Sequence, residues 1–107
     1  MKPNAGEALA RAICERFSGF GGRVEVESLV SRSWSSIAFC GERHRLGLRI
    51  EGRAAAAAAD RFLAELDVRP LPLGGHILAD IGFAGDSRGD DGRSVSLVLE
   101  ALTVEAR

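Results

Sequence analysis

Residues 34–50 read WSSIAFCGERHRLGLRI, two alternating runs on either side of a Gly-Glu dipeptide at positions 41–42. A two-residue loop with glycine in its first position suits a type II′ turn, whose twist matches the strands that it joins. Folding the stretch about this dipeptide predicts a hairpin with its large apolar residues on one face. This face holds Ile37, Phe39, His44, Leu46 and Leu48. The sequence therefore predicts a hairpin whose register is set by its own alternation.

The second face of this predicted hairpin combines arginine with tryptophan. It holds Trp34, Ser36, Ala38, Cys40, Arg43, Arg45, Gly47 and Arg49. Trp34 and Arg49 fall opposite each other, and a guanidinium over an indole ring stabilises by ~0.5–2 kcal/mol. Because aromatic residues and arginine are enriched in the cores of interfaces, this face indicates a contact surface rather than a reaction site.

The composition is that of an ordinary globular chain. Its 107 residues predict a single domain, 1–107, with 46% hydrophobic and 27% charged residues. The net charge of −1 argues against a general nucleic-acid binder, which needs a clear positive excess. The longest apolar run, 54–59, is far too short to cross a membrane, so the cytoplasm is the expected location. Thirteen of the fourteen basic residues are arginine, which is typical of a GC-rich bacterial genome.

Two stretches have helical periodicity. Asn4 can cap a first helix, whose residues recur at the spacing of one helical face. The apolar stripe of this helix consists of Leu9, Ile13 and Phe17. A second helix is predicted from about residue 53 to 66, because six consecutive alanines favour helix strongly. Residues 23–30 alternate and predict a strand, which a polar loop at 31–33 connects to the hairpin.

The last third of the chain predicts two more strands. On the side expected to face the core they carry Ile77, Ala79, Ile81, Phe83, Val95, Leu97, Leu99 and Ala101. On the other side they carry Leu78, Val98, Leu102 and Val104, beside Asp80 and Glu100. An antiparallel sheet with one solvated face normally alternates apolar and polar residues, so two apolar faces predict that something covers the second one.

Together these elements predict an α+β fold with the order α-β-β-β-α-β-β, an antiparallel sheet and two helices packed on one face. This order resembles the type III secretion chaperone-like fold. The resemblance covers most of the chain as an order of elements. It implies a dimeric α+β architecture whose members bind protein partners.

The reactive side chains form no recognised catalytic site. Cys40 and His44 fall on opposite faces of the predicted hairpin, so they are not expected to share a hydrogen bond. His76 and Asp80 lie on one strand, about 13 Å apart by strand rise. A metal held by His76 and Asp80 would need a third group from elsewhere, and the isolated Cys14 and Cys40 have no metal-binding spacing. No nucleotide-binding or nucleophile motif occurs. The sequence therefore predicts no metal and no cofactor.

The sequence favours a non-enzymatic module that forms a homodimer, or binds a protein partner, through its arginine- and tryptophan-bearing face. The residues predicted to form this surface are Trp34, Ala38, Arg45, Arg49, Leu78, Val98 and Leu102. Nucleic acid is disfavoured because Glu25 and Glu27 share the arginine face, and no membrane partner is expected. The alternative is a small enzyme or ligand-binding domain with a pocket between helices and sheet or at a dimer seam. That pocket would use His76, Asp80 and Cys40.

Overall fold

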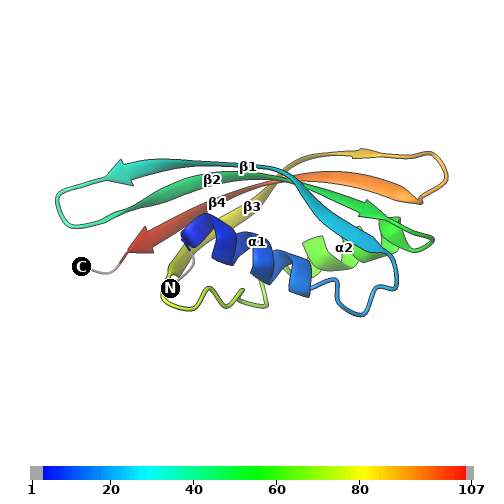
Figure 1. Cartoon of the computed structure of the whole chain (residues 1–107), viewed down its shortest axis with the longest axis horizontal. Coiled ribbons are helices and arrows are strands. Elements are labelled where there is room, and N and C mark those ends of the chain that lie inside the picture. The colour runs from blue at the N-terminus through cyan, green and yellow to red at the C-terminus, as the bar shows by residue number, and fades with distance from the viewer. Residues whose placement is uncertain (1–3, 106–107) are drawn as a thin grey trace.

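The computed structural model describes residues 4–105 and contains two helices and four strands (Figure 1). In chain order these elements are α1 (Ala5–Glu15), β1 (Arg23–Ser35), β2 (Cys40–Glu51), α2 (Ala55–Glu65), β3 (Ile77–Arg88) and β4 (Ser94–Glu105). All strands pair antiparallel, in the order β1-β2-β4-β3. The α+β class and the antiparallel sheet predicted from the sequence are confirmed.

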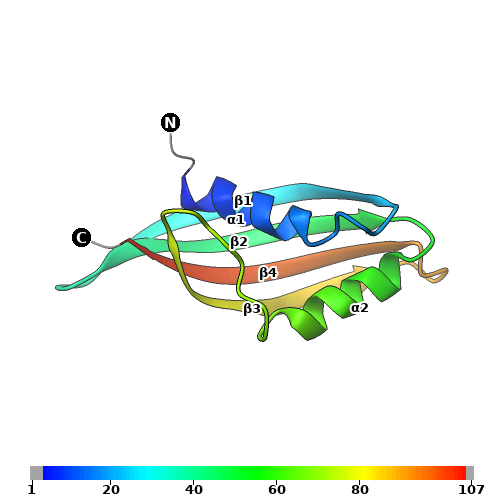
Figure 2. The same ribbon diagram turned by 90° about the horizontal axis from the view of Figure 1, so that it is seen from below.

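Both helices lie against the same face of the sheet, as predicted (Figures 1 and 2). α1 packs on β1 and β2, whereas α2 packs on β4 and β2. Each half of the chain is thus a helix followed by two antiparallel strands, and β2 and β4 join the halves at the centre of the sheet. No element within residues 4–105 covers the opposite face (Figure 1).

Where the sequence predicted two strands before position 41, the structure has one long strand, β1, and the predicted loop at 31–33 lies within it. The chain reverses at 36–39, where the Ser36 amide donates to the Phe39 carbonyl at 2.7 Å. The Phe39 amide donates in turn to the Ser36 hydroxyl at 3.2 Å, which is typical of serine in turns. The predicted turn at positions 41–42 is therefore wrong.

Gly41, which suggested that turn, lies inside β2. A Cβ atom there would collide with the backbone carbonyl of Thr103 on β4. Glycine at this position therefore permits close approach of two strands, a second common reason for glycine within a sheet.

The observed register gives β2 different partners from those predicted. Leu46 faces the helices, as expected, but lies opposite Leu29 and not opposite Ile37. Ile37 and Phe39 belong to the turn region, with exposed fractions of 104% and 55%. Their predicted place in the core is wrong, because the longer pairing of β1 with β2, which has a bulge between Val26 and Ser28, places Val24 and Leu29 against the core instead.

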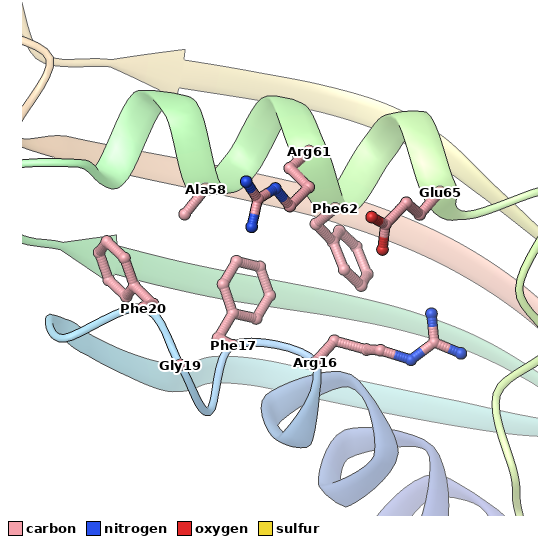
Figure 3. A pocket seen from close by; sticks show the side chains of 8 residues that line it. All are labelled: Arg16, Phe17, Gly19, Phe20, Ala58, Arg61, Phe62 and Glu65. Atoms are coloured by element: carbon pink, nitrogen blue, oxygen red, sulfur yellow. The ribbon is translucent and has the colours of Figure 1, made fainter.

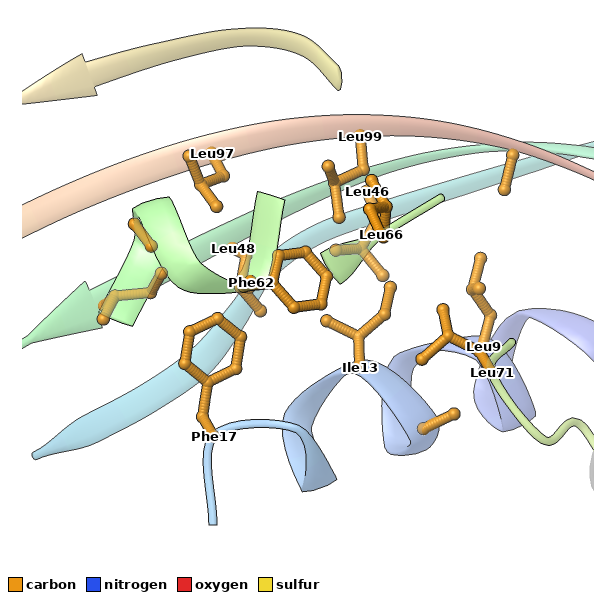
Figure 4. Packing of buried hydrophobic residues seen from close by; sticks show 14 of the residues in the cluster. Leu9, Ile13, Phe17, Leu46, Leu48, Phe62, Leu66, Leu71, Leu97 and Leu99 are labelled. Atoms are coloured by element: carbon orange, nitrogen blue, oxygen red, sulfur yellow. The ribbon is translucent and has the colours of Figure 1, made fainter. Parts of the chain in front are cut away.

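The core lies between the two helices and the central strands (Figure 4). The predicted stripe of α1 is confirmed, since Leu9, Ile13 and Phe17 are all buried. The Asn4 cap is confirmed too, because its side chain accepts the Glu7 amide at 2.8 Å. Phe17 meets Phe62 of α2 with ring centroids 5.1 Å apart, so these rings join the two helices. The connector after α2 adds two buried residues that the sequence analysis missed, Leu71 and Leu73.

The edge strand β3 does not alternate as predicted. Bulges between Leu78 and Asp80 and between Phe83 and Gly85 each insert an extra residue. The first bulge puts Leu78 opposite the buried Thr103, where it packs against the core, and leaves Ile77 on the other face, 52% exposed. The predicted faces of Leu78 and Ile77 are therefore wrong, because one added residue reverses a period of two.

The register makes a direct prediction about stability. Leu46→Ala should lower the free energy of unfolding by about 2–5 kcal/mol, because a fully buried leucine leaves a cavity. Phe39→Ala should lower it by less than about 1 kcal/mol, as expected for an exposed turn residue. Urea denaturation followed by circular dichroism measures both changes. A larger loss for Phe39→Ala would contradict the turn at 36–39.

Candidate functional site

The face of the sheet turned away from the helices, hereafter the open face, is covered by no helix or strand of the described residues (Figure 1). It carries apolar side chains from β1, β3 and β4. These are Val30, Trp34, Ile77, Val98, Leu102 and Val104. Val30 and Ile77 are 53% and 52% exposed, and the other four are half-buried by their neighbours on the sheet. Apolar sets of this kind on one surface are typical of interaction sites, which makes the open face a candidate.

Trp34 is the single tryptophan of the chain and lies near the tip of the β1–β2 hairpin. Its backbone pairs with Gly41, which offers no side chain beside the indole. The indole Nε1 is buried without a hydrogen-bond partner among residues 4–105, which costs roughly 1–3 kcal/mol for a buried donor. A cavity of about 340 Å³ next to it is lined by Ser33, Trp34, Ser35, Cys40, Gly41, Glu42 and Glu105.

Charged side chains of both signs lie on the open face and form two ion pairs there. Arg45 of β2 pairs with Glu100 of β4 at 2.8 Å, across the centre of the sheet. Farther along β2, Arg49 pairs with Glu51 at 2.9 Å. This hydrogen bond raises the pKa of Arg49 above its ordinary high value, with a smaller contribution from the nearby Glu25 and Glu27 carboxylates. Both ion pairs are partly exposed, so each contributes little to stability.

Arg32 and Arg43 form an unusual pair on the open face, because they lie directly opposite each other on β1 and β2. Like charges in this arrangement repel. Neither guanidinium has an ion pair or hydrogen bond with any residue from 4 to 105. Both line a shallow cavity of about 310 Å³ with Val30, Arg45 and Glu100. Within the described chain, the pair is thus a cationic site whose guanidinium groups have no ion pair of their own, since the nearby Glu100 pairs with Arg45.

Five of the seven residues predicted for the contact surface lie on the open face. These are Trp34, Arg45, Arg49, Val98 and Leu102. Ala38 lies in the exposed turn after β1 instead, and Leu78 packs against the core on the other face. The sequence analysis missed Arg32 as a member of this surface, because it placed the residue in a loop at 31–33 that lies within β1. Asp80 lies on the outward side of its strand, as predicted, although it was not included in the predicted contact surface.

The predicted contact between Trp34 and Arg49 does not form. Arg49 lies opposite Glu25, at the far end of β1 and roughly 30 Å from Trp34 by strand rise. The two residues were expected to meet only because the turn was placed at 41–42.

The reactive residues of the alternative enzyme hypothesis lie in different places. Cys40 is at the hairpin tip, with its Sγ atom 3.8 Å from a Glu105 carboxylate oxygen. Asp80 lies on the open face beside Leu102, and His76 precedes β3. Across residues 4–105, no three histidine, cysteine or acidic side chains are grouped as metal ligands would be.

Cys40 and His44 share one face of β2, contrary to the prediction, because no turn separates them. They remain roughly 13 Å apart by strand rise, too far for a hydrogen bond. Cys14, the other thiol, lies on α1, where burial raises its pKa and so disfavours the reactive thiolate.

His44 is buried on the helix side of the sheet, with 2% of its surface exposed. Its ring links the side chains of Ser31 and Thr103 in a chain of hydrogen bonds. The Thr103 hydroxyl donates to the Glu42 carbonyl at 3.4 Å, so it accepts from His44 Nε2 at 2.9 Å. His44 Nδ1 then accepts from the Ser31 hydroxyl at 2.7 Å. Burial lowers the pKa of His44, which the Glu42 carboxylate opposes and the His76 ring reinforces. A neutral imidazole thus satisfies two hydroxyl groups.

On the helix side, a small cleft separates the end of α1 from α2 (Figure 3). Its volume is about 140 Å³, and three phenylalanine rings, Phe17, Phe20 and Phe62, form its apolar lining. Arg16 at its mouth donates to the carbonyls of Arg69 and Pro70 at 3.0 and 2.6 Å, and so anchors the connector that follows α2. The lining contains neither histidine nor cysteine.

Comparisons with known proteins give no further assignment. No family model matches the chain, and no curated protein or solved structure matches it either. Within residues 4–105, neither helix has the length and apolar character needed to cross a bilayer.

The polar chain at His44 predicts a pH dependence of stability. Because the pKa of His44 is lowered in the folded state, the unfolded chain binds the proton first as the pH falls. The free energy of unfolding should therefore decrease below about pH 6.5, by up to about 1.4 kcal/mol per pH unit, until the folded-state pKa is reached.

Urea denaturation of wild type and His44→Gln between about pH 5 and 7 measures this effect, and the variant should have the flatter profile. His76→Gln is the matched control and should keep most of the wild-type slope, because burial is the main cause of the shift. Equal slopes in wild type and His44→Gln would assign the dependence to other groups.

Proposed function

We propose that this protein is a non-enzymatic interaction module that forms a homodimer through the open face. The observation that carries the proposal is the apolar set on this face, from Trp34 on β1 to Ile77 on β3, which no described element covers. An antiparallel sheet exposed to water on one side normally carries polar residues there. Apolar side chains on both sides of β4 are typical of a strand that is covered on both sides.

A second copy is the favoured occupant because the open face carries charges of both signs. A partner with one sign of charge would meet repulsion on part of the face, whereas a second copy can place basic residues over acidic ones. The dimeric architecture implied by the predicted resemblance to the type III secretion chaperone-like fold agrees with this choice.

The expected affinity is modest. Four strands about 4.8 Å apart and ten residues of rise give a face of roughly 600 Å² per subunit. This area is at the lower end for specific interfaces, and arginine and glutamate must be desolvated at the centre. We therefore expect a dissociation constant in the micromolar range.

We place the module in the cytoplasm. Cys14 and Cys40 are both free thiols, which suits a reducing compartment.

Self-association is measured by sedimentation and by the fluorescence of Trp34, the single tryptophan. Wild type should be a dimer at tens of micromolar, and dilution should shift the Trp34 emission, because the indole lies in the interface. Leu102→Asp should abolish the dimer by burying a charge opposite the second copy. Ile77→Asp, at a more exposed position, provides a second test with less risk to folding.

Val68→Asp is the matched control, because Val68 is 73% exposed and lies outside the open face, after α2. This variant should dimerise like wild type. A monomer at high micromolar concentration, or equal loss of the dimer in all three variants, would contradict the proposal.

A further inference from the structure

Toward the hairpin tip, the charges of the open face are segregated between its two halves, whereas farther from the tip β1 and β2 carry Glu25 and Glu51 beside Arg49. On β1 and β2 the residues Arg32, Arg43 and Arg45 occupy neighbouring positions. Residues that pair with one another across the four strands lie at one level of the sheet. At the levels of these arginines, β4 and β3 carry Glu100 and Asp80. Arg32 and Asp80 lie at one level, on opposite edge strands, and neither has an ion partner within residues 4–105. The face therefore has an unpaired cation at one edge and an unpaired anion at the other.

We infer that the two-fold axis of the dimer runs parallel to the strands, between β2 and β4, so that Arg32 of each subunit meets Asp80 of the other. The inference rests on the proposed homodimer and specifies its geometry. A symmetric dimer uses the same patch on both subunits. Rotation about this axis places β1 over β3 and β2 over β4 of the second copy, with every level of the sheet facing the same level.

Charge and shape both favour this axis. At the level of Arg32 and Asp80 it brings opposite charges together at both edges of the interface. At the centre it places each Arg45 near the Glu100 of both subunits, in a network of four charges. Gly41 and Gly47 of β2 face Val104 and Val98 of β4 in the second copy. Each of these valines thus packs over a glycine, which has no side chain to oppose it.

The other symmetric way to stack the two faces is less favourable. An axis in the plane of the face but perpendicular to the strands would place each strand over its own copy. Asp80 would then face β3 of the second copy, whose described open-face positions carry no basic residue, so the pairs of Arg32 with Asp80 could not form. Asp80 would remain without a cation.

Charge exchange tests the axis. Arg32→Glu and Asp80→Arg should each weaken the homodimer by about tenfold or more, because each variant places two like-charged pairs at the interface. Mixing the two variants should restore wild-type affinity, since the mixed dimer has opposite charges at both edges. There the two substituted positions face each other, and the two unchanged ones form the original pair of Arg32 with Asp80. The double variant in one chain should also recover the dimer. Analytical ultracentrifugation of labelled variants gives each dissociation constant.

The matched control is Arg61→Glu, an equal charge change at an exposed position of α2, which lies on the helix side of the sheet (Figure 3). It should leave the dissociation constant unchanged. Mixed with Asp80→Arg it should give only intermediate affinity, because that mixed dimer has one pair of Arg32 with Asp80 and one like-charged pair, whereas mixing with Arg32→Glu restores both edges. If wild type is a monomer, the proposed homodimer itself is wrong. If wild type is a dimer but Arg32→Glu and Asp80→Arg do not complement each other, the homodimer stands and the inferred axis is wrong.

Discussion

The antiparallel pairing of β2 with β4 is the constraint on which the rest of the structure depends. Leu46 lies opposite Leu99, and Leu48 lies opposite Leu97, all four fully buried under the helices. Each half of the chain alone is a helix on a two-stranded hairpin, which is marginal in water. Joining the halves through their second strands gives a four-stranded sheet wide enough to cover both helices and exclude water from the core between them.

The same pairing also determines the open face. Successive residues of a strand point to opposite sides, so the register that buries Leu46 against Leu99 also places Arg45 beside Glu100 on the outer side. The arrangement of charge on the open face is therefore a consequence of how the core is paired. A change in core register would change the open face together with the core.

His44 shows how the core ends toward the hairpin tip. Beyond the leucines of β2, the helix side of the sheet changes from apolar packing to hydrogen bonds with Ser31 and Thr103. A buried imidazole is tolerated there because both ring nitrogens have partners, and the lowered pKa keeps it neutral. The tip beyond this point extends past the helices (Figure 1) and includes Trp34 and Cys40.

Local sequence patterns were sufficient for the elements that bury one clear stripe. The 3.6-residue period of Leu9, Ile13 and Phe17 located α1, and the alanine run located α2. Alternation also assigned the correct faces to β2 and β4, and hence Arg45, Val98 and Leu102 to one surface. These patterns are local because each helix or strand buries its own residues at a fixed spacing.

Tertiary structure alone decided where β1 ends and where β3 bulges. Alternation near residues 34–40 suits a strand that turns at 41 as well as one that turns at 36, and glycine at 41 favoured the wrong choice. The longer ladder is formed because it places Leu29 over the core and lets Gly41 approach Thr103. Likewise, an extra residue after Leu78 places Ile77 and Leu78 on the faces of the sheet opposite to those that alternation predicts. Such choices depend on contacts between distant segments, and no pattern of period two within one strand contains them.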